Sequence, residues 1–227
     1  MSKFQNYTKP WIKTESAAEK KKRAEHVFRV LGKSYPDAKI ALKYGTDIQL
    51  LVAVILSAQC TDKKVNEVTV PLFKKYKTAK DFARAKPEVF EQEIRQTGFY
   101  RAKAKNITAA CKKIEADFGG SLPRTMAEMI TLPGVARKTA NVVLGNAYGV
   151  TDGIAVDTHV IRLSQRLGFT RQTDPVKIEK ELMMLFPKKD WFPLTYRLIN
   201  HGRAICIAQR PKCAVCPLNK LCPSSLV

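Results

Sequence analysis

The sequence predicts an all-α protein. Apolar residues recur at helical spacing along nearly the whole chain, and no stretch alternates apolar and polar residues as a half-exposed strand would. Helix-capping residues also precede many of the apolar segments. The chain has 227 residues, 45% of them hydrophobic, so it can bury a substantial core. We expect about ten helices packed as a compact globule.

The first half of the chain predicts five helices. Residues 1–15 are expected to form a loose basic arm, and Ser16 with Glu19 makes a capping box for a helix that ends at Gly32. The run KKKR at 20–23 is interpreted as a solvated face of this helix. Asp47 is expected to cap an apolar helix. That helix ends near Leu56. A third helix carries Val65, Val68, Leu72 and Phe73, and a fourth runs from Pro87 to Gly98. A fifth carries Ile107, Cys111, Ile114 and Phe118 and ends at Gly119.

The second half predicts five more. Thr125 and Glu128 form a second capping box, here for a short helix over 126–130. Asp174 and Pro175 open a later helix, since aspartate is a good cap and proline suits the first helical position. Of the other three helices, one carries Ala140, Val143, Leu144 and Ala147. The next carries Val160, Leu163 and Leu167, and the last runs from Leu194 to about Ala204.

The charge of the chain indicates a polyanionic partner. Lys and Arg number 40 against 20 Asp and Glu, which gives a formal net charge of +20. Such an excess suits nucleic acid, because bound cations release condensed counterions; the alternative is a merely soluble, highly charged surface. The longest apolar run, LLVAVIL at 50–56, is far shorter than the ~20 residues that span a bilayer, so no membrane partner is expected. No secretory signal is visible in residues 1–20, and we expect an intracellular protein.

The stretch LPGVARKTANVVL at 132–144 predicts a turn that leads directly into a helix. Arg137 and Lys138 fall in the first helical turn, where the backbone dipole and unpaired N–H groups favour anions over cations. Either a phosphate docks there or the lysine loses its proton; an ordinary helical corner is the structural alternative. The residues predicted to contact DNA at this turn are Leu132, Gly134, Val135, Ala136, Arg137 and Thr139.

Two side chains near this turn are candidates for catalysis. Lys138 is either a phosphate contact or a nucleophile. Asp157 follows it by nineteen residues and stands just before a predicted helix. Its carboxylate either caps that helix or takes part in chemistry, in which case Thr158 could serve as the cap.

Four of the six cysteines predict a metal site. Cys206, Cys213, Cys216 and Cys222 follow the spacing C-x6-C-x2-C-x5-C, and four closely spaced thiolates in a reducing compartment are typical metal ligands. The spacing alone leaves zinc and a [4Fe–4S] cluster open. The remaining two, Cys60 and Cys111, lie in apolar patterns and are expected to be core thiols.

Together these motifs resemble the endonuclease III branch of the helix–hairpin–helix DNA glycosylases, over roughly residues 24–223. The family's hairpin is usually written LPGVGRKTA, and this chain departs from it at Ala136. The cysteine spacing is that of the family's cluster, which favours [4Fe–4S], with zinc as the alternative. In the loop between the first two cysteines, Arg210 and Lys212 are expected to meet a phosphate.

The resemblance also implies an architecture. We expect two helical lobes flanking a DNA-binding cleft, with the helix–hairpin–helix motif in one lobe and the cluster loop at the C-terminus of the other. Residues 40–151 would form a six-helix barrel domain that contains the hairpin. Residues 16–39 plus 152–227 would form the iron–sulfur cluster domain, and residues 1–15 the basic arm.

The activity that the resemblance implies is base-excision repair. The enzyme would be a bifunctional N-glycosylase and AP lyase that acts as a monomer. Its substrate would be double-stranded DNA with oxidised pyrimidines or abasic sites. Lys138 would be the nucleophile and Asp157 its partner. Because the damaged nucleotide must be extruded, Gln59 in LSAQCTD would fill the gap and Phe99 in TGFY, where relatives have leucine, would wedge the opposite strand.

Several alternatives remain open at this point. Phe99 could instead make a hydrophobic contact after Gly98, and His159 is either near the pocket or a packed surface histidine. Among functions, the adenine glycosylase branch shares the cluster and the aspartate but lacks the lysine and usually has a further C-terminal domain. A non-catalytic DNA-binding module that uses the hairpin and the basic surface is the other alternative.

Overall fold

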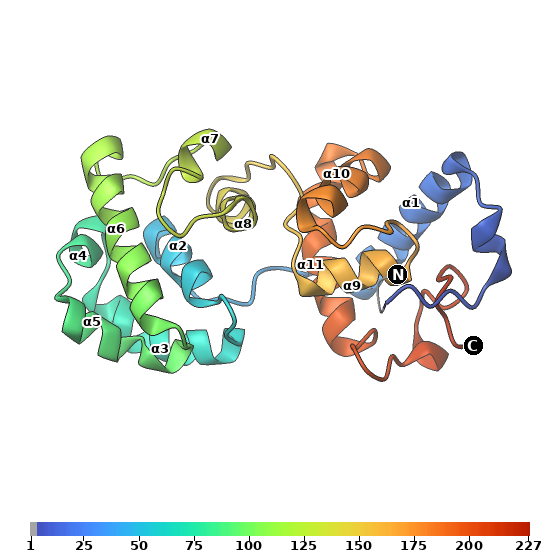
Figure 1. Cartoon of the computed structure of the whole chain (residues 1–227), viewed down its shortest axis with the longest axis horizontal. Helices are drawn as coiled ribbons and strands as arrows, with labels where there is room; N and C mark the ends of the chain where they lie inside the picture. The colour runs from blue at the N-terminus through green and yellow to red at the C-terminus, as the bar shows by residue number, and fades with distance from the viewer. Residues whose placement is uncertain (1–3) are drawn as a thin grey trace. The chain divides into compact units, whose positions relative to one another are not determined.

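The computed structural model describes residues 4–227, which fold into helices joined by loops, with no strand among them (Figure 1). The all-α prediction is confirmed; the first three residues of the predicted basic arm lie outside the described part. The α-helices are α1 (Ala17–Ser34), α2 (Asp47–Leu56), α3 (Asp62–Lys75), α4 (Ala79–Ala83), α5 (Pro87–Glu93), α6 (Tyr100–Phe118), α7 (Met126–Met129), α8 (Arg137–Tyr148), α9 (Thr158–Arg166), α10 (Pro175–Leu185) and α11 (Lys188–Ala204). Short 3₁₀ helices cover Pro10–Lys13, Arg95–Thr97 and Cys213–Val215. No helix in the described range is both long and apolar enough to cross a membrane.

The chain divides into two compact units, each with its own hydrophobic core. One, the middle unit, is Ile40–Asp152 and holds α2 to α8. The other, the terminal unit, joins the residues up to Lys39 with Gly153–Val227 and holds α1 and α9 to α11.

Helix α2 forms the centre of the middle unit. Its residues from Ile48 to Leu56 are all buried, as expected for a helix that is apolar on every side. It packs against α3, α6 and α8, while α4 and α5 cover α6 (Figure 1). Three rings cluster in this core with centroids 5.1–6.0 Å apart: Tyr76 stacks on Phe82, and Phe90 meets both edge to face. The packing of α2 against α6 and α8, and of α4 and α5 against α6, fixes the two helices that carry most of the candidate site in this unit.

In the terminal unit, α9 packs against both α10 and α11, and α11 also packs against α1. Caps read from the sequence are found here: Ser16 and Glu19 make the predicted capping box of α1, and Asp174 caps α10. The first and last helices of the chain therefore share one core.

Four predicted helix bounds are wrong. Helix α1 continues past Gly32 to Ser34; a Cβ on Gly32 would lie 3.1 Å from the guanidinium carbon of Arg197, so this glycine gives room to a neighbour and does not end the helix. Thr46, not Asp47, is the N-cap of α2. Helix α5 ends at Glu93, and the 3₁₀ helix Arg95–Thr97 follows it before Gly98. Helix α11 begins at Lys188, ahead of the predicted start at Leu194, and contains Pro193.

Residues 4–15 are packed and do not form a loose arm. The N–H groups of Thr8 and Lys9 donate to the carbonyl of Pro223 at 2.8 and 3.1 Å. Arg23, expected on a solvated face, is buried and pairs with Glu15 at 2.6 Å. Its guanidinium also donates to the carbonyl of Leu167 at 2.6 Å. The N-terminal segment thus closes over the terminal unit through a buried ion pair.

We expect Arg23→Met to lower the free energy of unfolding by about 3 kcal/mol, because it leaves the Glu15 carboxylate buried without its cation. Urea denaturation followed by circular dichroism measures this change. Arg29→Met is the matched control, since Arg29 is an exposed arginine of the same helix. Equal shifts of the urea midpoint in both variants would contradict the assignment.

Candidate functional site

The turn between α7 and α8 is fixed by a glycine. Gly134 has φ of +78°, in the left-handed region, and a Cβ there would lie 2.8 Å from Cβ of Asn106 on α6. Real Cβ atoms do not approach so closely, and the left-handed backbone itself disfavours a side chain. The turn therefore rests directly on α6, and only glycine fits.

Ala136, the departure from the family's hairpin pattern, causes no backbone strain. It is the N-cap of α8 with φ of −88° and ψ of 169°, an extended conformation open to any residue. Its side chain caps nothing, and the first turn of α8 has no acidic residue. Leu132 and Val135 are buried, so contact with a ligand at these two positions would come from the backbone. The arrangement leaves the positive end of α8 without a protein anion of its own.

Lys138 is the second residue of α8, and its side chain is exposed. Burial therefore does not act on its amine. Arg137 beside it contacts Asp152, with Nη1 3.7 Å from the carboxylate and Nη2 donating to the carbonyl at 3.3 Å. The acidic partner offsets part of the positive charge that the sequence places next to the lysine.

Four predicted DNA-contact residues line one pocket of the middle unit: Gln59, Phe99, Gly134 and Thr139. Gln59 and Phe99 have φ of 52° and 47°, and no other non-glycine residue in the described range has a positive φ. The Phe99 side chain is 66% exposed, so most of its surface is open to a ligand. The structure thus brings together two strained, outward-facing side chains and the hairpin glycine.

Sequence reasoning missed Lys103 and Asn106, which line the same pocket. Lys103 is only 5% exposed, and its Nζ donates to the carbonyls of Leu56 and Thr97 at 2.8 and 2.7 Å. Burial lowers the pKa of its ammonium. A signal was available, because Lys103 stands four residues before Ile107 on the otherwise apolar stripe of α6.

In the terminal unit, Asp157 caps α9. Its Oδ1 accepts the N–H of Val160 at 2.8 Å, and its backbone is extended. Thr158 is the first helical residue, so the alternative in which Thr158 provides the cap is wrong. The cap uses one of the two carboxylate oxygens and holds the carboxylate at the N-terminus of α9.

His159 is packed against α11. Its Nδ1 lies 3.1 Å from Nη2 of Arg162, and the same Nη2 donates to the carbonyl of Gly202 at 3.0 Å. A Cβ on Gly202 would lie 2.9 Å from both side chains. Of the two interpretations of this histidine, the packed one agrees with these contacts.

The four cysteines of the predicted metal site line one cavity near the C-terminus, and none is in a disulfide. Burial raises the pKa of the Cys216 thiol to about 11 and that of Cys222 to about 12. Nη1 of Arg166 donates to Sγ of Cys206 at 3.3 Å. A bound metal would displace these protons, because the thiolate is the form that binds metals.

His201 is buried next to Cys216. Burial lowers its pKa to about 4, so the ring is neutral at pH 7. Nδ1 lies 3.1 Å from the Tyr35 hydroxyl, and Nε2 lies 3.4 Å from Sγ of Cys216. If Tyr35 donates to Nδ1, the proton on Nε2 points to the sulfur, as in the outer shell of many metal sites.

The donor set bears on the kind of metal. Among residues 4–227, no three His, Cys, Asp or Glu side chains converge closely enough to hold a single ion. The four sulfurs nevertheless surround one cavity. Four cysteine sulfurs at one cavity are the donor set of both structural zinc sites and [4Fe–4S] clusters. Arg210 and Lys212, in the loop between the first two ligands, are exposed.

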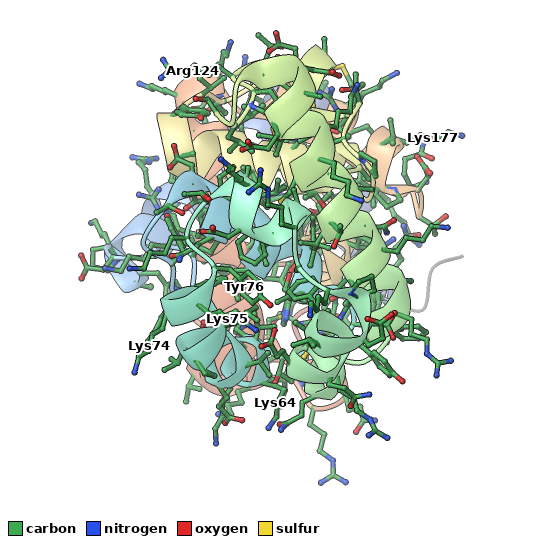
Figure 2. All side chains as sticks on the ribbon, turned by 90° about the vertical axis from the view of Figure 1, so that its left-hand side faces the viewer. Lys64, Lys74, Lys75, Tyr76, Arg124 and Lys177 are labelled. Atoms are coloured by element: carbon green, nitrogen blue, oxygen red, sulfur yellow. The ribbon has the colours of Figure 1, made fainter. Side chains whose placement is uncertain are left out.

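Basic side chains extend from the surface of the middle unit (Figure 2). Lys64 and Lys74 project from α3, and Lys64 pairs with Glu67 at 2.5 Å. Lys75 pairs with Glu93 at 2.7 Å. Such pairs involve only some of the cations, since Lys and Arg outnumber Asp and Glu by 40 to 20. The excess remains at the surface, where a polyanion can meet it.

Residues 52–188 match the family HhH-GPD, the HhH-GPD superfamily base excision DNA repair proteins. The match covers more than half of the chain, and the chain belongs to this superfamily.

Two similar relatives within the superfamily are endonuclease III proteins. An endonuclease III from Synechocystis sp. is 53% identical over 92% of this chain and 95% of its own length. An endonuclease III from Bacillus subtilis is 49% identical over 88% of this chain and 92% of its own length. The endonuclease III resemblance drawn from the sequence motifs is confirmed.

Solved structures agree with this assignment. A non-covalent endonuclease III–DNA complex and a trapped covalent endonuclease III–DNA intermediate each match with a TM-score of 0.86, at 46% identity over 90% of this chain and 96% of theirs. A thermostable thymine-DNA glycosylase, at 21% identity and a TM-score of 0.81, shares the fold.

We expect Gly134→Ala to lower the free energy of unfolding by about 1–2 kcal/mol, because it places a side chain on left-handed backbone and against Asn106. Its affinity for undamaged duplex DNA, measured by fluorescence anisotropy, should fall as well. Ala136→Gly is the control and should change stability by less than about 0.5 kcal/mol, since that backbone is extended. A larger loss from Ala136→Gly would contradict this account of the turn.

Proposed function

We propose that this chain excises oxidised or ring-saturated pyrimidines from double-stranded DNA and then cleaves the strand at the resulting abasic site. Lys138 is the nucleophile and Asp157 its partner. The observation that carries the proposal is the position of Lys138, an exposed amine in the first turn of α8, directly after a turn built on Gly134.

Lysine explains how one enzyme can perform both steps. The neutral amine attacks C1′ of the deoxyribose, and the C1′–N bond breaks with its electron pair leaving on the base, which takes up a proton. The attached nitrogen loses a proton, its lone pair then forms the C=N bond as the C1′–O4′ bond breaks, and O4′ takes up a proton, which gives a protonated Schiff base. Loss of a proton from C2′ drives the electron pair toward C3′, and the bond to the 3′ phosphate breaks by β-elimination. Water hydrolyses the imine and restores Lys138.

The amine must lose its proton before it attacks. Lys138 is exposed in the first turn of α8, and no side chain caps this end of the helix. The charge of Arg137 beside it is partly offset by the contact with Asp152.

Asp157 acts on charge that develops later. Its Oδ1 is fixed by the cap to Val160, so the carboxylate is held in one orientation. A fixed carboxylate can stabilise the cationic sugar of the transition state and accept protons.

Comparison with relatives supports DNA as the partner. Two solved structures that resemble this chain hold endonuclease III with DNA, and one of them is a trapped covalent intermediate, the kind of adduct that a Schiff base of Lys138 would form. The backbone of the hairpin turn, with Arg137 and Thr139, would hold a phosphate beside the nucleotide. A single copy of the chain carries every residue that this mechanism uses, so we propose a monomer.

We also propose that Cys206, Cys213, Cys216 and Cys222 hold a [4Fe–4S] cluster. Four free thiols that line one cavity, with the cysteine spacing of the endonuclease III family, support this choice. The cluster would supply a structural tie for the C-terminal segment, with Arg210 and Lys212 presented to a phosphate. Thiolate ligands of this kind favour a reducing, intracellular compartment.

Borohydride should trap a covalent adduct between the protein and a duplex that contains one abasic site, because it reduces the Schiff base. Lys138→Gln should abolish the adduct on a denaturing gel, while Lys112→Gln, which removes an exposed lysine of α6, should leave it unchanged. An adduct of normal yield with Lys138→Gln would show that another amine reacts. Weaker, salt-sensitive binding as its sole effect would favour the non-catalytic module.

The purified protein should be brown and contain about four iron atoms per chain. Metal analysis by mass spectrometry and the visible absorption spectrum measure this directly. Cys216→Ser should lower the iron content, whereas Cys111→Ser should not, because Cys111 is buried in the core of the middle unit. One zinc ion per chain in place of iron would contradict the cluster assignment.

A further inference from the structure

Two exposed side chains of the middle unit are held on strained backbone. Gln59 and Phe99 have φ of 52° and 47°, a region that costs a non-glycine residue about 1–2 kcal/mol. Such strain persists only where the surroundings enforce it. Both side chains project outward, and Phe99 is 66% exposed, so their own packing does not enforce it.

One buried cation lies behind both residues. Nζ of Lys103 donates to the carbonyl of Leu56 at 2.8 Å and to that of Thr97 at 2.7 Å. Leu56 is the last residue of α2 and stands three positions before Gln59. Thr97 ends the 3₁₀ helix and stands two positions before Phe99. The same ammonium therefore joins the chain just ahead of both strained positions.

These carbonyls are suited to a cation. The last carbonyls of a helix lack intrahelical partners and carry the negative end of its dipole. Both partners of Nζ are main-chain carbonyls and not carboxylates, so the charge is buried without a full ion pair. Lys103 is 5% exposed, and taking a cation out of water costs free energy; the same burial lowers the pKa of its ammonium. An apolar side chain would satisfy the core of α6 at less cost.

We propose that Lys103 is a positioning residue: it fixes the two loop starts so that Gln59 and Phe99 stand ready to enter the duplex where the nucleotide is extruded. This inference rests on the proposed glycosylase function, and it concerns extrusion, not the chemistry at C1′. Asn106, one turn further along α6, supports Gly134 of the hairpin in the same pocket. Lys103 and Asn106 of α6 thus fix the positions of three loops that would contact DNA, those of Gln59, Phe99 and Gly134.

Lys103→Met tests the proposal on two substrates. Excision of 5,6-dihydrothymine from a duplex requires extrusion, and its single-turnover rate should fall roughly 10- to 100-fold, the effect expected of misplaced groups. Borohydride trapping on a single-stranded oligonucleotide with an abasic site requires no extrusion and should stay within about twofold of wild type. Lys103→Arg, which keeps a cation with several donors, should recover most of the duplex rate. Lys105→Met, an exposed lysine of the same helix, is the matched control.

A double-mutant cycle separates positioning from a purely structural role. In a Gln59→Ala/Phe99→Ala background, Lys103→Met should cost no more than about twofold on the duplex, because there is nothing left to position. An equal loss in both backgrounds would overturn the proposal while leaving the glycosylase function intact. If Lys103→Met fails to fold, the same cycle is run with Lys103→Gln, which keeps a neutral donor. Wild-type protein without excision or trapping would overturn the proposed function, and this inference with it.

Discussion

The contact between the hairpin turn and α6 is the constraint on which the candidate site depends. Gly134 brings its backbone onto Asn106 so closely that no side chain fits between them. Because the turn is pinned there, α8 begins at Arg137 and places Lys138 in its first turn. Because Ala136 has no capping side chain, this end of α8 stays open to an external anion. The contact that stabilises the turn therefore also sets the position of the proposed nucleophile.

The energetically unfavourable features of the middle unit lie together around the pocket that is proposed to contact DNA. Its core is apolar and well packed, yet the pocket wall contains a buried ammonium, Lys103, and two left-handed residues, Gln59 and Phe99. Each of these features is unfavourable for folding alone. Their grouping around one pocket is the pattern expected of a site in which strain is kept for function.

The terminal unit uses polar contacts in a different way. Arg166 and His201 direct N–H or ring nitrogen toward the sulfurs of Cys206 and Cys216. Arg23 ties the N-terminal segment to the same unit through a buried ion pair. This unit also holds the four cysteines of the predicted metal site, which line one cavity. Their neighbourhood is thus closed by segments from both ends of the sequence.

The sequence by itself determined the all-α class, several helix starts such as those after Ser16 and Asp174, and the thiol spacing that indicates a metal site. These features are local, because helix periodicity and caps depend on residues within about four positions of one another. Tertiary structure alone decided that Arg23 is buried, that Asp157 itself caps α9, and that Lys103 joins two loops. Arg23 and Lys103 bond to carbonyls 144 and 47 residues away along the chain, and sequence patterns do not encode partners at that distance. For Asp157 the pattern allowed two caps, and only the folded backbone selected one.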